Sequence, residues 1–215
     1  MVTVKSEDRC GNAQNVASTT TAFVLYDLEF TAWEGSMARG WSGPGEYREV
    51  VQIGAVRLEP HRLAEIASLD LLVRPRLNPL LSDYFVALTG VTNEKISTAG
   101  IAFADAYWQF YEFCDGATMG CFGRDDLVLR ENLTLYGLRD LPAPGSVVNL
   151  RTWIETLGID LTGIHCGMIA DKLKIDLPGR IHDALFDARA LAAALRHLVA
   201  QGAPNPLTRQ SNEYR

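Results

Sequence analysis

Short apolar segments at the start of the 215-residue chain limit its fold most strongly. Segments 22–26, 47–58 and 65–73 are apolar and rich in β-branched residues, which indicates strands. Between the first two lies segment 31–46, which is rich in Gly, Ser and Trp and is typical of a long loop. Three successive strands of this kind predict an antiparallel meander.

From residue 82 onward, strand-like and helical segments alternate. Strands are expected at 117–122 and 147–149, where short apolar runs occur. Helices are expected at 82–88, after a capping Thr92, and at 101–114, 125–136, 165–173 and 184–200. A meander followed by alternating strands and helices predicts an α/β fold, in which a mixed sheet of the meander plus parallel strands is flanked by helices.

The two ends of the chain lie outside this pattern. Residues 1–21 are small and polar, and we expect them to form a flexible lead. One domain is expected over residues 22–200, which is long enough to bury a sizeable core. Residues 201–215 follow the last helical segment and are expected to form a C-terminal tail, frayed from residue 203.

Charge and cysteine usage narrow the class of protein. A net charge of −6 argues against a protein that coats long nucleic acid, although an enzyme that grips a few nucleotides remains possible. The four cysteines form no CxxC pair, so no structural zinc site is expected, and their scatter is typical of a reducing compartment. No apolar run approaches the roughly 18–20 residues that cross a bilayer. We therefore expect a cytoplasmic protein without a membrane partner.

Two carboxylates, Asp27 and Glu29, directly follow the first apolar segment. Residues two apart in a strand point to the same face, so both would lie together at the end of a buried strand. Their repulsion and desolvation would be relieved by a cation, as in two-metal phosphoryl-transfer sites. A solvated strand end is the alternative, because most carboxylates are exposed.

Asp125 and Asp126 lie between the strand that ends at Phe122 and the helix that follows. A carboxylate here lies at the C-terminal edge of a strand, which is where open α/β sheets place their sites. The alternative is a helix cap, since Asp commonly begins helices. We expect one of the two aspartates to cap the helix and the other to face the site.

His182 directly precedes the last helix, and Asp187 lies about one turn into it. Asp183, between them, is expected to be the N-cap. A histidine can take a proton from water near neutral pH, and Asp187 would point toward the same site. Taken alone, His182 could equally be an ordinary surface or core residue. His165 has no comparable neighbours in sequence and is expected only to begin a helix.

These clusters, in this order, resemble the motifs of the DEDDh family of 3′→5′ exonucleases, which have a ribonuclease H-like fold. The family pattern D-x-E, Asp and H-x4-D reads here as Asp27 and Glu29, then Asp125, then His182 and Asp187. The flanking stretches EVVQIGAV, LSDYFVALTGVT and DARALAAAL extend the resemblance over most of the chain. The second stretch resembles the branch of small-RNA and histone-mRNA 3′-end exoribonucleases and their bacterial relatives.

The resemblance implies a metal-dependent exonuclease that acts on the 3′ ends of single-stranded nucleic acid, with RNA favoured and DNA as the alternative, and releases 5′-nucleoside monophosphates. Asp27, Glu29, Asp125 and Asp187 would hold two Mg²⁺ or Mn²⁺ ions, and His182 would be the general base. Spacing relative to the family favours Asp125 over Asp126 as the ligand. Residues that correspond to contacts with the terminal nucleotide in relatives are Phe30, Thr31, Leu88 and Thr89.

Three questions stay open at this level. The chain could instead be a phosphodiesterase for small nucleotides, since its net charge is negative. It could also be an exonuclease-like module that binds nucleic acid without cleaving it, although such a module would usually have lost part of a motif. Trp33 and Trp41, in the loop after the first motif, could stack on bases or could pack that loop onto the domain.

Overall fold

The computed structural model of the chain describes residues 22–143 and 145–208. Its centre is a five-stranded sheet with the strand order β3-β2-β1-β4-β5. The strands are β1 (Phe23–Phe30), β2 (Val50–Leu58), β3 (Glu65–Leu72), β4 (Thr118–Cys121) and β5 (Val147–Asn149). The first three pair antiparallel, whereas β4 is parallel to both β1 and β5. The predicted fold class, a meander joined to parallel strands, is confirmed.

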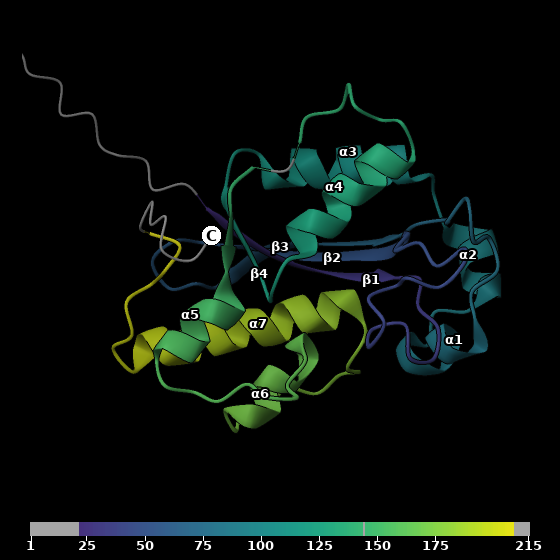
Figure 1. The fold of residues 1–215 in the computed structure, drawn as a ribbon. Helices are drawn as coiled ribbons and strands as arrows, with labels where there is room; N and C mark the ends of the chain where they lie inside the picture. Colours follow the sequence, from purple (N-terminus) through teal and green to yellow (C-terminus); the bar gives the residue numbers. More distant parts are fainter. Residues whose placement is uncertain (1–21, 144, 209–215) are drawn as a thin grey trace, which may run out of the picture.

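Helices cover both faces of the sheet (Figure 1). They are α1 (Asp83–Thr89), α2 (Asn93–Ala99), α3 (Phe103–Cys114), α4 (Asp125–Leu135), α5 (Leu150–Thr156), α6 (Ile169–Lys172) and α7 (Ala184–Ala200), with a 3₁₀ turn η1 (Cys166–Met168) before α6. One face carries α3 and α4 and the other carries α5, α6 and α7, while α1 and α2 lie beyond the end of the sheet. Among the described residues, no helix has both the length and the apolarity needed to cross a bilayer.

Strand β1 is buried on both faces, and this explains its continuous apolar sequence. Phe23 and Leu25 pack into the core formed with α5 and α7, whereas Val24 and Tyr26 pack into the core formed with α3 and α4. Side chains alternate along a strand, so the odd-numbered residues of β1 face α7. The strand continues beyond the apolar run to Phe30, which carries its last residues to the edge of the core.

A glycine lets α7 approach the sheet closely. A Cβ atom at Gly54 of β2 would lie 2.1 Å from the backbone carbon of Ala184, the first residue of α7. Any side chain there would push the start of the helix away from the sheet. The close contact therefore fixes where the N-terminal turn of α7 lies relative to β1 and β2.

Most of the predicted caps are present. The side chain of Thr92 accepts a hydrogen bond from Lys95 N, and that of Asp183 accepts one from Phe186 N. The expected cap of α4 by an aspartate is wrong, because the cap position is Arg124, whose side chain makes no capping hydrogen bond. Asp125 and Asp126 are instead the first two residues of that helix.

The structure differs from the sequence predictions at three further places. The helix expected at 165–173 is a 3₁₀ turn followed by the four-residue α6. Helix α5 was not predicted, although Asn149 caps it and its buried residues show helical spacing. The C-terminal tail is not frayed throughout, because Leu207 is 3% exposed and packs in the core with α5 and α7. The flexible lead expected at 1–21 and the rest of the tail lie outside the described residues.

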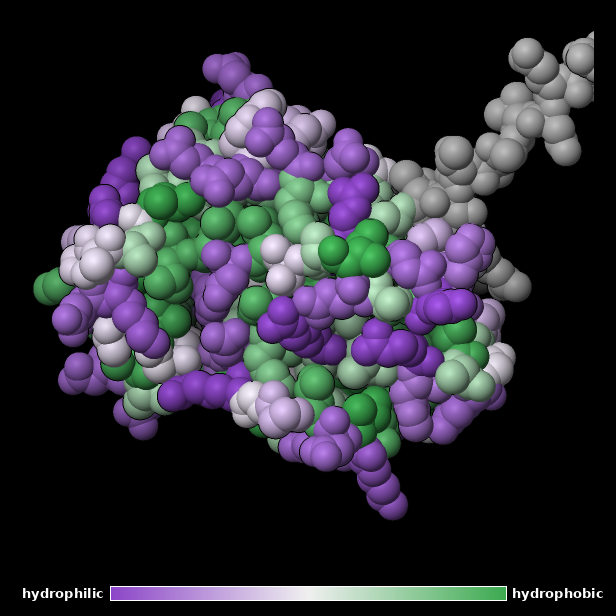
Figure 2. Space-filling model, turned by 180° about the vertical axis from the view of Figure 1, so that it is seen from behind, coloured by the Kyte–Doolittle hydropathy of each residue, from purple (hydrophilic) through white to green (hydrophobic). Residues whose placement is uncertain are grey.

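Seen from behind, the surface mixes hydrophobic and hydrophilic side chains (Figure 2). Hydrophobic groups gather toward one side of this face, and hydrophilic groups surround them. Large exposed apolar residues include Leu77, Leu80, Trp108 and Tyr111. Apolar atoms on this scale are ordinary for a protein surface, so they carry no functional conclusion by themselves.

Candidate active site

Asp27 and Glu29 lie on the face of β1 that α7 covers, as the alternation of side chains along the strand requires. Each residue is only 7% exposed. Within β1, Asp27 pairs with Gly54 and Glu29 with Gln52 of β2. The two carboxylates therefore project from the middle of the sheet into a space between strand and helix, and the solvated strand end considered above is excluded.

Asp187 reaches the same space from the first turn of α7 and is 2% exposed. A Cβ atom at Gly167 would lie 2.2 Å from Asp187 Oδ1, so only a glycine leaves room for this carboxylate. Burial raises the pKa of Asp187, and the nearby backbone N–H groups of His182 and Gly167 partly offset that rise. The turn η1 and the loop before α7 thus close around Asp187.

Asp125 enters from the opposite side of β1. Strand β4 is parallel to β1, so both end at the same edge of the sheet, and the chain that leaves β4 begins α4 at Asp125. Its negative charge raises the pKa of both Asp27 and Glu29. The four predicted carboxylates therefore converge in one buried space.

Burial and mutual repulsion set the electrostatics of this group. Burial, followed by the charges of Asp125, Asp187 and Glu29, raises the pKa of Asp27 well above its ordinary value. Burial, followed by the charges of Asp187, Asp125 and Asp183, raises the pKa of Glu29. The pKa values of Asp125 and Asp187 are each raised to about 7, mainly by burial. Such a cluster is costly unless positive charge enters it.

Unsatisfied oxygens indicate where such a charge fits. Asp125 Oδ2 and Asp187 Oδ1 are buried and have no hydrogen-bond partner. Ligand atoms of Glu29, His182 and Asp187 also lie within 4.8 Å of one another. Carboxylate oxygens without donors are the ligands that Mg²⁺ and Mn²⁺ prefer, so the residues present fit divalent cations.

His182 lies at the mouth of the carboxylate group in an unusual backbone conformation. Its φ is 64°, in the left-handed region that non-glycine residues rarely adopt. Such strain persists where surrounding contacts hold it, and it is common at functional sites. Burial, His165 and Arg180 lower the pKa of His182, so the ring is neutral near pH 7 and can accept a proton.

Two neighbours of His182 were missed by sequence reasoning. The ring of His165 lies 5.8 Å from that of His182, although the two are seventeen positions apart. Arg180 donates hydrogen bonds to the carbonyl oxygens of Ala87 and Leu88, which ties the His182 loop to the end of α1. Sequence spacing carries no signal for either contact, because both depend on the folding of distant segments.

Asp126, the competing candidate for the metal ligand, points elsewhere. Its carboxylate accepts hydrogen bonds from Arg124, at 2.9 Å from Nε and 3.1 Å from Nη2. The pair lies at the surface, where the Arg124 side chain is 53% exposed. Asp125, and not Asp126, faces the other carboxylates. Arg124 and Arg180 are both engaged in local contacts.

The four residues predicted to contact substrate differ in whether their side chains are available to a ligand. Thr31 Oγ1 donates to Tyr47 O and accepts from Glu49 N, and Thr89 Oγ1 is engaged with Phe85 O and Val91 N. Both threonine side chains are buried, so their hydroxyls hold local structure together. Phe30 and Leu88 are partly exposed and can pack on a ligand.

Trp41 packs the loop after β1 onto the domain. Its indole Nε1 donates to Thr31 O at 2.9 Å, and its ring lies 5.4 Å from that of Phe30. The guanidinium of Arg48 lies 5.6 Å from the Trp41 ring. Its positive charge partly offsets the rise in pKa that burial causes at Asp125. For Trp41 the packing alternative therefore holds, and Arg48 is a cation beside the site that the sequence did not indicate.

Comparisons with known proteins agree with this arrangement. The model of the exonuclease family RNase_T matches residues 24–195. The 3′-5′ exoribonuclease 1 of Mus musculus is 23% identical over 190 residues, which cover 83% of this chain and 53% of the mouse protein. The chain thus spans about half the length of the curated relatives it matches.

Solved structures share the fold. The nuclease domain of 3′hExo, a DEDDh family member bound to rAMP, superposes with a TM-score of 0.75 at 21% identity, covering 90% of this chain and 99% of that domain. Pop2p of S. pombe, in a form with bound Mg²⁺ and Mn²⁺, superposes with a TM-score of 0.64 at 15% identity, covering 90% of this chain and 88% of Pop2p.

Proposed function

The chain belongs to the RNase_T exonuclease family, and from this premise we propose that it hydrolyses phosphodiester bonds from the 3′ end of single-stranded nucleic acid. The observation that supports this most directly is the convergence of four carboxylates, three of them on buried residues and two with unpartnered oxygens, beside a half-buried histidine. We place the exonuclease domain at residues 22–200, with Leu207 packed against it.

Asp27, Glu29, Asp125 and Asp187 would hold two divalent cations, Mg²⁺ or Mn²⁺. When bound, these ions supply the positive charge that lowers the pKa of a water molecule and stabilises charge at the reacting phosphate. The sheet and the close packing of α7, which the missing side chains of Gly54 and Gly167 permit, preorganise the carboxylates. Preorganised charge needs little reorganisation during the reaction, and this is the main contribution of the protein here.

His182 is proposed as the general base that accepts the proton of the attacking water on a ring nitrogen. Its lowered pKa keeps the ring unprotonated near neutral pH, as this role requires. The contact of Arg180 with the end of α1 holds the His182 loop in place. A terminal nucleotide would pack on Phe30 and Leu88, and Thr31 and Thr89 would shape the surrounding backbone.

RNA is the favoured substrate, with DNA possible, because the curated relatives are named exoribonucleases. The products would be 5′-nucleoside monophosphates. A reducing, cytoplasmic location is supported by the free, buried state of Cys114, Cys121 and Cys166.

The direct test is incubation with 5′-labelled RNA and DNA oligomers in Mn²⁺ or in EDTA. A ladder that shortens from the 3′ end only with metal supports the proposal. Cleavage of small nucleotides alone would favour the phosphodiesterase alternative, and binding without cleavage would favour the non-cleaving module. Either result would overturn the exonuclease assignment.

The role of His182 is tested with His182→Ala, for which we expect a rate loss of about 10²–10⁴-fold. Mn²⁺ binding, measured by calorimetry, should survive, because the proposed role is proton transfer. The matched control is His61→Ala, which removes an exposed histidine from the turn between β2 and β3. If His182→Ala abolishes Mn²⁺ binding, the residue is a ligand and not the base.

A further inference from the structure

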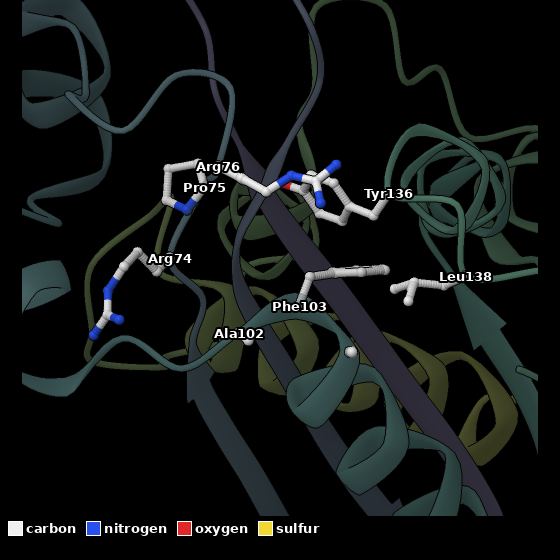
Figure 3. A pocket seen from close by; sticks show the side chains of 8 residues that line it. Arg74, Pro75, Arg76, Ala102, Phe103, Tyr136 and Leu138 are labelled. Atoms are coloured by element: carbon white, nitrogen blue, oxygen red, sulfur yellow. The ribbon is translucent and has the colours of Figure 1, made fainter.

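A cavity opens on the other face of the sheet from α7. It has a volume of about 430 Å³, within the range of small-molecule sites. Its wall comes from the segment after β3, the first turn of α3 and the end of α4 (Figure 3). None of the residues that line it belongs to the predicted active site.

Planar groups form one wall of this cavity. The rings of Phe103 and Tyr136 lie 5.4 Å apart, and the guanidinium of Arg76 lies over the Tyr136 ring at 4.7 Å from its centroid. Figure 3 shows Arg76 in front of that ring, with Phe103 and Leu138 beside it. Aromatic rings and a flat guanidinium are the surfaces on which nucleobases stack.

Positively charged side chains line the cavity, in a protein whose net charge is −6. Arg74 and Arg76 line it, no carboxylate does, and neither arginine forms an ion pair with any residue that the structure describes. The twelve-residue helix α3 begins at Phe103 without a side-chain cap, so its first N–H groups lack the usual acceptor. An anion would be stabilised by these groups and by the arginines.

One buried residue joins this cavity to the sheet edge that carries the active site. Glu49 accepts a hydrogen bond from the Tyr136 hydroxyl and one from the backbone N–H of Arg76. The N–H of Glu49 itself donates to Thr31 Oγ1 at 3.0 Å, two residues beyond Glu29. The cavity and the carboxylate group therefore lie at the same end of the sheet, on opposite faces.

We propose that this cavity is a second nucleotide-binding site, which takes a nucleoside 5′-monophosphate group by stacking its base on Phe103 and Arg76 and placing its phosphate near Arg74 and the start of α3. The group could come from a free mononucleotide or from an upstream residue of a bound strand. Both sources share this chemistry, and the experiment separates them.

The test is calorimetry with adenosine 5′-monophosphate in EDTA, so that divalent cations do not contribute to binding. Wild type should bind saturably at millimolar nucleotide, and adenosine without phosphate should bind more weakly. Arg76→Ala should weaken binding at least about tenfold, as expected for loss of a stacked cation. Ala104→Trp, which fills the cavity from α3, should abolish it. The matched control is Arg62→Ala, an exposed arginine at the far end of the sheet.

The source of the nucleotide is read from kinetics. If Arg76→Ala raises KM for long oligomers but not for dinucleotides, the occupant is an upstream residue of the strand. If adenosine monophosphate instead changes the wild-type rate and Ala104→Trp removes that effect, the occupant is a free nucleotide. Wild-type binding by both folded variants, or no binding by wild type, overturns the proposal. Because binding is measured without metal or cleavage, its failure leaves the proposed exonuclease function untouched.

Discussion

Two carboxylate sites lie at the same end of the sheet and differ in whether hydrogen-bond donors stabilise their negative charge. Glu49, directly before β2, is fully buried and accepts five hydrogen bonds. The donors are the backbone N–H groups of Arg76, Leu77 and Asn78, the Asn78 side-chain amide and the Tyr136 hydroxyl. A carboxylate so well satisfied stabilises the turn that follows β3, and no cation is needed.

The carboxylates around Asp27 have no comparable set of donors. Two of their oxygens are unpartnered, and the charges of Asp125 and Asp187 raise the pKa of both Asp27 and Glu29. In the metal-free protein this arrangement costs free energy, and it persists because the surrounding packing imposes it. The difference teaches that burial of an acidic residue does not by itself indicate function. A buried carboxylate indicates a functional site when the fold provides too few hydrogen-bond donors to satisfy its oxygens.

The largest effect is expected for Asp187→Asn, which keeps the shape of the side chain and removes its charge. The exonuclease rate should fall by about 10³-fold or more, because the position would no longer hold a cation. Thermal stability in EDTA should stay equal or rise, since a repelled charge is removed. A variant that loses activity only because its Tm drops would place Asp187 with the structural carboxylates instead.

Glu49→Ala should lower stability and leave metal binding intact, the reverse of the result expected for Asp187→Asn. It leaves several partly buried N–H groups without an acceptor, at about 1–3 kcal/mol each, so unfolding in urea should need about 3 kcal/mol less. Mn²⁺ binding by the folded fraction should remain, because Glu49 does not face the carboxylate group. The matched control is Glu112→Ala, which removes an exposed glutamate from α3 and should have little effect. Equal stability of the two variants would contradict the comparison.

The pH dependence of stability should follow from the raised pKa values. Asp125 and Asp187 have a pKa of about 7 in the fold, above the ordinary aspartate value of about 3.9. Between these values the folded protein binds more protons than the unfolded chain, so stability falls as pH rises from about 4 to about 7. Without metal, the Tm should drop by about 5–10 °C from about pH 5 to about pH 8.

Two controls sharpen this prediction. Mn²⁺ should raise the Tm most at the higher pH, where the carboxylates are charged and free to bind it. The double variant Asp125→Asn/Asp187→Asn should show a much flatter profile in EDTA. A wild-type Tm that rises with pH over this interval would mean that the carboxylates are already satisfied within the protein.

The smallest effect is expected for Asp126→Asn. This residue pairs with Arg124 at the surface, and such pairs contribute about 0–1 kcal/mol, so the rate should stay within about fivefold of wild type. Asp125→Asn should behave like Asp187→Asn in the same assay. If Asp126→Asn is inactive and Asp125→Asn is active, the two neighbouring aspartates have been assigned the wrong way round.

Local sequence patterns predicted most of the helices and strands. They failed where contacts between distant segments determine the structure. The apolar run of β1, the capped start of α7 and the strand β5 all carry their signal within a few residues. The expected helix at 165–173 is broken instead, because Gly167 must lie against Asp187 of another element. The residues after 202 were expected to form a frayed tail, yet Leu207 fills a gap beside Gly120 of β4.

The sequence by itself determined which residues form the candidate site, because the order and spacing of the acidic residues and His182 match the three motifs of the exonuclease family. Tertiary structure alone decided what those residues face. It turned Asp125 inward and Asp126 toward Arg124, placed His165 beside His182, and surrounded Glu49 with donors. The physical reason is that a carboxylate acquires its character from its burial and its hydrogen-bond donors, which come from segments far apart in the chain.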